Sequence, residues 1–277
     1  MRKIVFIFMV IMFLNNCTLL KKKHKIIISP EQVSSAIVVD DNYLLNKYLS
    51  DGFPVDYNFN GNTLLERVLE NNSLKSLKTL LNRGVDIEQR DEYGKTPIFY
   101  VRSLEALQML IDDGAEIDVY DKNNESLLTF FIKNKPESYS ELIINKGVKI
   151  DDWNTLFWAS VEGTPQIITH MAKNGADFST KNKNGNYPIY YSYNENNILE
   201  LLKVGNYNLS EVNLKNENIL GEVYLRAVAN GYIKVVDKLI EMGVNPRYMS
   251  YGDNALSIAN DTENEDMINY LKSKDLK

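Results

Sequence analysis

The chain repeats one hydrophobic pattern several times along its length. Short segments with leucine, isoleucine or valine at helical spacing end at a glycine, and the first of these runs through Leu77, Leu80 and Leu81 to Gly84. Apolar residues three and four positions apart predict a helix with one buried face. Glycine just beyond such a segment predicts a helix end in the left-handed conformation, which other residues adopt only at a cost in energy. The same ending recurs at Gly114, Gly147, Gly175 and Gly243.

The closing glycines are followed, at a nearly constant distance, by residues that open a new helix. Twelve residues after Gly84 the sequence reads Thr96-Pro97-Ile98, and twelve after Gly114 it reads Ser126-Leu127-Leu128. Thr and Ser cap helix N-termini, and Pro is tolerated at the first helical position because that N–H has no partner within the helix. We place further openers at Thr63, Asn154, Tyr187, Glu222 and Asn254, and turns between paired helices at Asn72, Gly163 and Gly231.

This register resembles that of the ankyrin repeat, in which each helix pair opens with Thr-Pro-Leu and closes with a leucine-rich segment, Gly, Ala and Asp. The resemblance covers nearly all of the mature chain and implies an all-α ankyrin-repeat solenoid, with stacked helix-turn-helix units joined by loop or hairpin fingers. Each unit buries its apolar face only against its neighbours. We expect about eight units, at residues 29–58, 59–91, 92–121, 122–151, 152–182, 183–216, 217–249 and 250–277.

The family's histidine after Thr-Pro-Leu is absent from every unit. Residues such as Thr129, Phe157 and Leu225 stand at its position. We therefore expect the side-chain hydrogen bonds between repeats to be lost, and apolar or aromatic packing to replace part of them.

Some segments also differ in length from the family pattern. The helix pairs opened by Thr96 and Tyr187 are three residues short, so their helices should lose most of a turn. The finger over residues 147–154 should be clipped and that over residues 205–222 extended. The stack should bend or loosen at both places.

The first residues indicate a targeting segment. Met1-Arg2-Lys3 is basic, and the eleven apolar residues from Ile4 to Leu14 are too few to span a bilayer comfortably but typical of a signal peptide. The following Leu14-Asn15-Asn16-Cys17 resembles a bacterial lipobox. The resemblance implies a signal peptide at residues 1–16, lipidation of Cys17 and a basic tether over residues 17–28. Asn16 departs from the small residue usual before the cysteine, so the alternative is an uncleaved anchor helix.

Either form of this segment ties the chain to a membrane. We expect a place in a bacterial cell envelope, on the outer membrane or the periplasmic face of the inner one, with surface exposure left open.

Composition narrows the function further. The chain has 277 residues, of which 44% are hydrophobic and 25% charged, as in a folded protein. Its net charge is −6, and because six cationic residues precede Ser29, the part from Ser29 onward carries −12. Nucleic-acid binding needs clustered cations, so this acidic body argues against a nucleic-acid partner.

Motifs for chemistry are missing from the sequence. Cys17 is the single cysteine, which excludes an internal disulfide or a thiolate metal site. No HExxH, GxSxG, P-loop or GxGxxG motif occurs. We therefore predict no enzymatic activity, no cofactor and no metal. A packing role is favoured for His170, for Trp158 at a core-facing position, and for the tyrosines 187, 190, 191 and 193 over a ligand box.

In the ankyrin family the concave side contacts the partner, through finger tips and exposed first-helix positions. Phe59, Tyr93 and Tyr251 are the tip residues that we expect to act as anchors, since aromatic residues dominate interface energetics; the alternative is that they are ordinary solvated turn residues. Carried over by position, the candidate protein-binding residues are Phe59, Asn60, Tyr93, Lys95, Lys122, Asn123, Lys183, Asn184, Tyr251 and Asp253.

These inferences predict a monomeric, membrane-anchored scaffold that binds a protein partner. A second hypothesis is an immunity or inhibitor protein for a toxin or enzyme, whose basic surface the acidic body would attract. The third is a small-ligand or enzymatic module, which would need a pocket with convergent polar groups.

Overall fold

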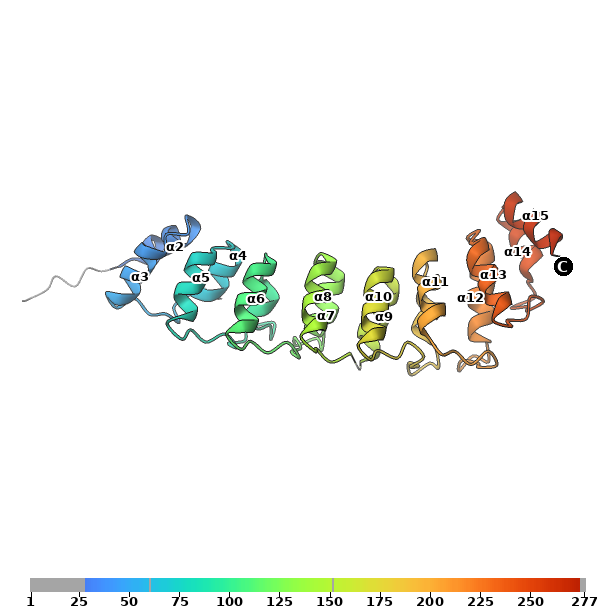
Figure 1. Cartoon of the computed structure of the whole chain (residues 1–277), viewed down its shortest axis with the longest axis horizontal. Coiled ribbons are helices and arrows are strands. Elements are labelled where there is room, and N and C mark those ends of the chain that lie inside the picture. Colours follow the sequence, from blue (N-terminus) through green and yellow to red (C-terminus); the bar gives the residue numbers. More distant parts are fainter. Residues whose placement is uncertain (1–27, 60, 151, 275–277) are drawn as a thin grey trace, which may run out of the picture. The chain divides into compact units, whose positions relative to one another are not determined.

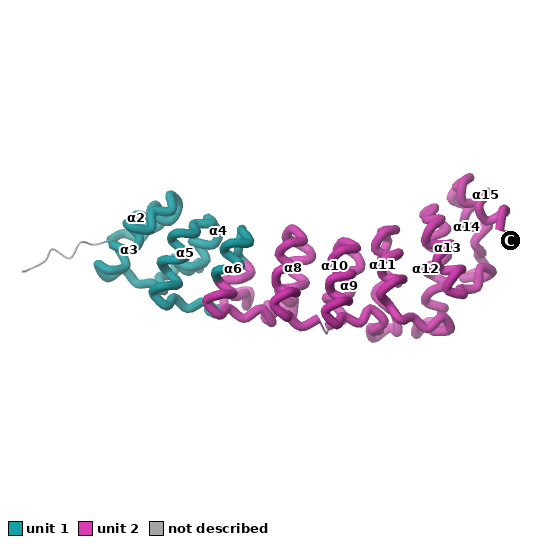
Figure 2. The backbone as a smooth tube through the Cα atoms, viewed as in Figure 1, with its two compact units in different colours: residues 1–89, 100–109 teal, residues 90–99, 110–277 magenta. Residues whose placement is uncertain are grey.

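The structure is a computed structural model that describes residues 28–59, 61–150 and 152–274. The predicted signal peptide, Cys17, most of the tether and Asn60 lie outside these residues. Within them the regular elements are helices, apart from one hairpin whose two strands have two residues each. This confirms the all-α prediction. The described residues form two compact units, one within 28–89 and 100–109 and the other within 90–99 and 110–274 (Figure 2).

The first unit contains two complete helix pairs. Its hairpin joins β1 (Asn58–Phe59) to β2 (Asn62–Thr63) just before a helix begins. Thr63 opens that helix as predicted, because its Oγ1 accepts the Glu66 N–H while Glu66 Oε2 accepts the Thr63 N–H. The helices are α2 (Pro30–Val38), α3 (Asn42–Ser50), α4 (Leu64–Glu70), α5 (Leu74–Leu81) and the start of α6 (Leu104–Asp112) (Figure 1).

The second unit continues the same plan, with helix pairs side by side along the chain (Figure 1). Its 3₁₀ helices are η1 (Pro97–Tyr100), which ends one residue beyond the unit's first segment, and η2 (Pro188–Tyr191). Its α-helices are the end of α6, then α7 (Leu127–Asn134), α8 (Glu137–Asn145), α9 (Trp153–Val161), α10 (Pro165–Lys173), α11 (Glu195–Val204), α12 (Ile219–Ala229), α13 (Ile233–Glu241), α14 (Ala255–Asp261) and α15 (Glu265–Ser273).

The core of each unit lies between consecutive helices rather than at one centre. In the α7–α8 pair, Leu127, Leu128, Phe131, Ile143 and Ile144 are almost completely buried. Burying each such side chain stabilises the stack by roughly 1.5–3 kcal/mol. The apolar face predicted from the spacing is therefore the face that joins one helix pair to the next.

The five predicted closing glycines all adopt the left-handed conformation, with φ between 68° and 100°. At the first of them, the Gly84 N–H donates to the Leu81 carbonyl, and the following Val85 N–H donates to the Leu80 carbonyl. Bonds of this kind satisfy carbonyl groups that have no partner within the helix. The two helix pairs predicted to be short begin with η1 and η2 in place of α-helices, which agrees with the missing residues.

Gly205 ends α11 differently from these five glycines. Its φ is −84°, so it does not serve as a left-handed stop. A Cβ atom at this position would lie 2.2 Å from the ring of Tyr207. The close approach of that ring leaves no room for a side chain at this position, which explains the glycine.

Two predicted helix openers were wrong. α9 begins after Asp152 and not at Asn154, and α12 begins after Asn218 and not at Glu222, since the Asp152 and Asn218 side chains accept the capping hydrogen bonds. The segment after Gly205 is therefore close to the usual length, and the additional residues form a longer helix, α12, of 11 residues. The observed caps are Asp and Asn, which cap helices at least as effectively as Thr or Ser.

Candidate protein-binding surface

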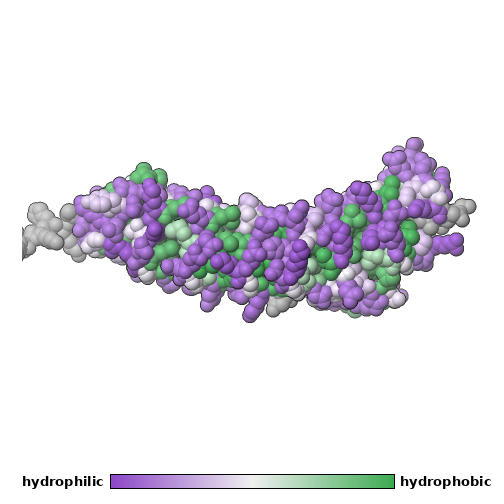
Figure 3. Space-filling view, in the orientation of Figure 1, coloured by the Kyte–Doolittle hydropathy of each residue, from purple (hydrophilic) through white to green (hydrophobic). Residues whose placement is uncertain are grey.

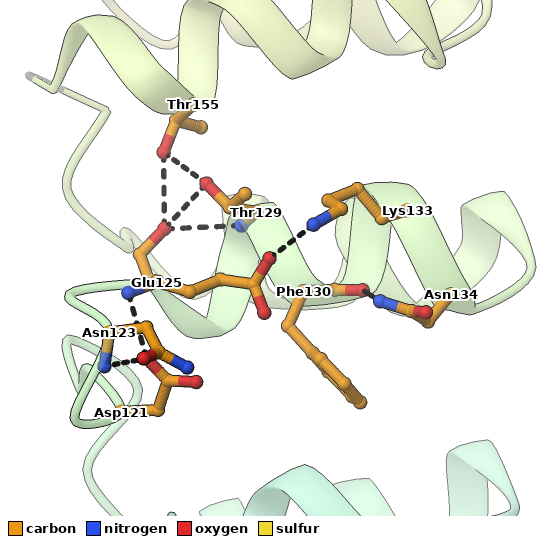
Figure 4. Close-up of polar contacts among 9 residues, drawn as sticks. Asp121, Asn123, Glu125, Thr129, Phe130, Lys133, Asn134 and Thr155 are labelled. Carbon is orange, nitrogen blue, oxygen red and sulfur yellow. Dashed lines mark hydrogen bonds and ion pairs between the residues drawn. The ribbon is translucent and has the colours of Figure 1, made fainter.

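Four fingers of the second unit share one turn, built by an Asp or Asn side chain. Asp91 Oδ1 accepts the N–H groups of Tyr93 and Lys95, and Asp121 Oδ1 accepts those of Asn123 and Glu125 (Figure 4). Asn182 and Asn213 make the same pair of bonds in later fingers. The residue three positions after each of these Asp or Asn residues has a positive φ; these are Gly94, Asn124, Gly185 and Asn216. The finger backbones are thus fixed before any partner arrives.

Neighbouring finger tips also bond to each other through the backbone. The Lys122 N–H donates to the Tyr93 carbonyl over 2.9 Å, and the Leu214 N–H donates to the Asn184 carbonyl over 3.0 Å. Lys122 Nζ donates to the Glu92 carbonyl over 2.6 Å. Each backbone bond joins the tip of one finger to the tip of its neighbour, and the candidate residues Lys122, Asn123, Lys183, Asn184 and Asp253 are exposed.

The three predicted aromatic anchors differ in how free they are. Tyr93 is 60% exposed and Tyr251 is 85% exposed, but the Tyr251 hydroxyl donates to Glu217 Oε1 over 2.6 Å. Phe59, in the first unit, lies under the guanidinium of Arg67, with 4.5 Å from Cζ to the ring centroid. Lys95, another candidate tip residue, has its Nζ 4.5 Å from the centroid of the Phe130 ring. Tyr93 is therefore the least restrained of the three anchors.

Buried hydroxyls join the α7–α8 pair to the next one, contrary to the expectation that such bonds are lost. Thr129 Oγ1 and Thr155 Oγ1 are 2.7 Å apart, and Ser126 Oγ lies 2.9 Å from Thr129 Oγ1 and 3.1 Å from Thr155 Oγ1 (Figure 4). Thr129 and Thr155 are both fully buried. Because the helix opens at Asp152, Thr155 and not Phe157 takes the position of the family histidine. The corresponding residue in α12 is Gly221 and not Leu225.

Five aromatic side chains form a connected cluster on the first helices of two neighbouring pairs. This aromatic ridge consists of Trp153, Phe157 and Trp158 from α9 and Tyr190 and Tyr191 from η2. Its ring centroids lie 5.1–5.8 Å apart, within the range for favourable aromatic pairs. All five residues are half-buried. Trp158 is thus not enclosed in the core, and of the four clustered tyrosines only Tyr187 is fully packed, at 3% exposure.

The ridge runs beside the fingers and has a cation near each end. Lys133 Nζ lies 4.3 Å from the Trp158 ring and bonds Glu125 Oε1 of the finger over 2.7 Å. The Arg226 guanidinium lies 4.9 Å from the ring of Tyr193 and 5.8 Å from that of Tyr190. Contacts of this kind are worth about 0.5–1 kcal/mol each at exposed sites. The ridge is therefore a fixed surface with apolar centre and charged ends.

Two finger asparagines hold the ridge against the finger. The Tyr191 hydroxyl accepts hydrogen bonds from Asn182 Nδ2 and Asn186 Nδ2, each over 3.0 Å. Asn182 is the residue whose other atom, Oδ1, builds the finger turn. One side chain therefore couples the shape of the finger to the position of a ridge ring.

An acidic group lies next to the ridge. Glu217 is only 9% exposed, and its carboxylate accepts hydrogen bonds from Tyr251, Asn213 and Tyr190. The bonds from Tyr251 and Asn213 lower the pKa of Glu217. Burial and the nearby Glu217 charge raise the pKa of Tyr190 to about 12. At neutral pH this part of the surface therefore carries a negative charge held by neutral donors.

Sequence reasoning missed the aromatic ridge because each of its residues fits a packing position. Trp153 and Phe157 are four residues apart, a spacing that also describes a buried helix face. A recognisable signal was present in the density of aromatic residues between Trp153 and Tyr193. What decides their exposure is the neighbouring helix pair, which is short at η2 and leaves the rings partly uncovered.

The described part of the chain lacks two features typical of metalloproteins and of membrane-spanning proteins. Residues 28–59, 61–150 and 152–274 contain no group of three or more His, Cys, Asp or Glu side chains that could hold a metal ion. No helix there has the length and apolar character needed to cross a membrane. His170 is on α10, where its Nε2 lies 2.9 Å from Asn145 Oδ1. Polar residues cover much of the face seen in Figure 3, with apolar patches between them.

Several solved structures share this fold. The chain matches the human ASB11 ankyrin repeat domain at 19% identity and a TM-score of 0.56, covering 72% of this chain and 98% of that one. An ankyrin repeat domain from Acinetobacter baumannii AYE matches at 18% identity and a TM-score of 0.53, covering 77% and 98%.

A third match is a chain from the complex of the predatory endopeptidase Bd0816 from Bdellovibrio bacteriovorus with the immunity protein Bd3460. It has 22% identity and a TM-score of 0.51, and the match covers 64% of this chain and 99% of that one. No family model matches the sequence, and no curated protein does. The fold predicted from the closing glycines and helix openers is confirmed: the chain has the all-α fold of ankyrin repeat domains.

Proposed function

We propose that the chain is a protein-interaction module that binds a protein partner through the aromatic ridge and the adjoining finger tips of its second unit. The observation that carries the proposal is the ridge itself, since five half-buried rings lie in contact beside a finger. Aromatic residues supply most of the binding energy in protein interfaces, and rigid rings lose little entropy on binding. The hydrogen bonds that fix the fingers and Tyr191 support a surface that is organised in advance.

A membrane tether is the second part of the proposal. The basic start, the apolar run and the sequence Leu14-Asn15-Asn16-Cys17 support lipidation of Cys17 and a place in a bacterial cell envelope. Radiolabelled palmitate incorporated into the full chain should be lost in Cys17→Ser. Equal incorporation by both proteins would remove the lipid anchor from the proposal.

Inhibition of an enzyme or toxin is a second candidate function. It is favoured by the match to a chain from a complex between an endopeptidase and an immunity protein. The net charge of −12 from Ser29 onward would speed association with a basic partner. In this case the captured partner should be an enzyme whose activity falls when the chain is added.

The test is affinity capture from cell-envelope extracts with the full chain in detergent. The ridge variant carries Phe157→Ala with Trp158→Ala, and the control carries Tyr43→Ala, which removes a ring that is 78% exposed on α3. We expect wild type and control to retain the partner and the ridge variant to lose it by about tenfold or more, the cost of truncating aromatic anchors. Far-ultraviolet circular dichroism checks that the ridge variant stays folded. Equal capture by a folded ridge variant would refute the proposal.

A separate variant with Tyr93→Ala and Tyr251→Ala tests the anchors expected from sequence. Loss of capture there, with the ridge variant unaffected, would move the interface from the ridge to the finger tips. The two outcomes distinguish a surface identified from the structure from one predicted by position in the repeat.

A further inference from the structure

The first unit contains an open hollow of about 570 Å³ between α2, the hairpin and α4. Tyr57 and Phe59 form aromatic walls, Ser34 comes from α2, and Arg67 comes from α4. The rings of Tyr57 and Phe59 are in edge contact, with centroids 4.8 Å apart. This site is separate from the aromatic ridge and involves none of its residues.

Arg67 is held in the hollow by neutral groups alone. Its Nη1 donates to Ser34 Oγ over 2.6 Å, and its guanidinium carbon lies 4.5 Å from the centre of the Phe59 ring. Its Nε is buried and has no hydrogen-bond partner within the described part of the chain. The hydroxyl and the ring fix the position of the cation without neutralising its charge.

Arg67 forms no ion pair with a described residue, although Glu31 also lines the hollow. The chain from Ser29 onward carries −12 and offers carboxylates in abundance. A guanidinium can donate five hydrogen bonds in a planar fork, and Arg67 makes one of them among the described residues. Spare donors on a fixed cation, at the floor of an open hollow, are what an anionic group needs.

We propose that this hollow binds a carboxylate group from an acidic peptide segment of a partner. A guanidinium fork matches the two oxygens of a carboxylate, and the rings of Tyr57 and Phe59 offer apolar surface to the carbon chain that carries it. A phosphate fits less well, because the hollow supplies one arginine and the exposed carboxylate of Glu31 repels a doubly charged anion about twice as strongly as a singly charged carboxylate. Phe59 thereby supports Arg67 and is not a free anchor.

The experiment is an NMR titration of the full chain in detergent micelles, labelled with ¹⁵N-arginine. The resonance of Arg67 Nε reports directly on the guanidinium, and Arg83 is an internal control because its Nε already donates to Asn46 Oδ1 over 3.0 Å. The probe is acetyl-Gly-Glu-Gly-amide. The matched control replaces Glu by Gln, and further arms use acetyl-Gly-Gly-Gly with a free terminal carboxylate and inorganic phosphate.

We expect the Glu peptide to shift the Arg67 resonance in a saturable manner, with a dissociation constant of about 1–10 mM, and to leave Arg83 unmoved. A fluorescein-labelled form of the peptide should bind Arg67→Gln about tenfold or more weakly than wild type, and Arg83→Gln equally well. Saturation by the free terminal carboxylate alone would assign the hollow to a chain terminus, which also supports a carboxylate site.

Three results would overturn the proposal: equal shifts with the Gln peptide, tighter binding of phosphate than of the Glu peptide, or unchanged binding by Arg67→Gln. Because Phe157 and Trp158 stay intact in every arm, failure of this titration leaves the capture experiment at the ridge unaffected. Conversely, failure of the ridge variants leaves the carboxylate site standing.

Discussion

The hydroxyls of Thr129 and Thr155 allow the coupling between two neighbouring helix pairs to be measured. Each can be replaced by valine, which keeps the branched shape and removes the hydroxyl. Thr129→Val loses the bonds to Ser126 and Thr155, and Thr155→Val loses those to Thr129, Ser126 and the Asp152 carboxylate. Because both side chains are completely buried, no water replaces the lost partners.

The magnitudes follow from the bonds that each change removes. A neutral hydrogen bond contributes about 0.5–1.5 kcal/mol net, and one to a charged group about 1.5–3 kcal/mol. Thr129→Val, which removes two neutral bonds, should therefore destabilise the protein by about 1–3 kcal/mol. Thr155→Val should destabilise it by about 2–4.5 kcal/mol, counting the bond to Thr129 and the bond to the Asp152 carboxylate, because Ser126 and Thr155 already donate their protons elsewhere. The double variant should cost less than the sum by about 0.5–1.5 kcal/mol, since the bond between the two threonines is then removed only once.

Urea unfolding followed by tryptophan fluorescence suits this cycle. Both tryptophans of the chain, Trp153 and Trp158, are on α9, the helix that carries Thr155. The signal therefore reports the unfolding of the segment concerned even if other helix pairs unfold separately, as repeat arrays can. Thr262→Val, at an exposed residue on the C-terminal side, serves as control and should change stability by no more than about 0.5 kcal/mol. Strictly additive losses would refute a direct bond between the helix pairs.

Three further predictions concern single residues of the second unit. Tyr207→Phe should raise the free energy of unfolding by about 1 kcal/mol, because the Tyr207 hydroxyl is buried without a hydrogen-bond partner among the described residues; a loss of stability in urea would contradict this. Asn218→Ala should lower the free energy of unfolding by about 1 kcal/mol, because it removes the cap of α12. Unchanged stability would contradict a helix start at Asn218 and favour the start expected from sequence. Glu217→Gln should be destabilising at neutral pH, because the folded state holds the pKa of Glu217 below its unfolded value. The stabilisation by the charged carboxylate is complete above about pH 4.3 and disappears as the pH falls through the folded pKa. Urea midpoints measured from neutral to acid pH should converge for wild type and Glu217→Gln, and a constant difference would exclude this role of the carboxylate.

Helix openers were predicted correctly at Thr63, Ser126 and Asn254, and wrongly for α9 and α12. Thr63 and Ser126 stand in the expected register and cap α4 and α7. Asp152 and Asn218 cap α9 and α12 equally well, but the register counted back from the closing glycines gave Asn154 and Glu222, because the loop before α9 is short and α12 is a longer helix. Cap chemistry is local, whereas the number of residues in a loop depends on how the helix pairs on either side pack.

The finger tips could be located from the sequence, but the aromatic ridge and the contacts of the tip residues could not. Finger tips such as Tyr93 and Tyr251 are exposed, as turn chemistry predicts. The hydroxyl of Tyr251 is nevertheless bound to Glu217, which lies 34 residues earlier in the chain. The aromatic ridge likewise depends on contacts between α9 and η2, and no local pattern specifies which rings those contacts leave uncovered.

The sequence by itself determined the class of fold, because a glycine stop, a capped opener and an apolar helix face are local features that repeat along the chain. Left-handed glycines such as Gly84 end their helices whatever the neighbouring repeats do. Only the tertiary structure decided which side chains stay uncovered, because the exposure of Trp158, and the absence of an ion pair at Arg67 among the described residues, depend on the residues of adjacent helix pairs. Those contacts join positions some thirty residues apart, such as Ser34 and Arg67, and no periodic pattern records them.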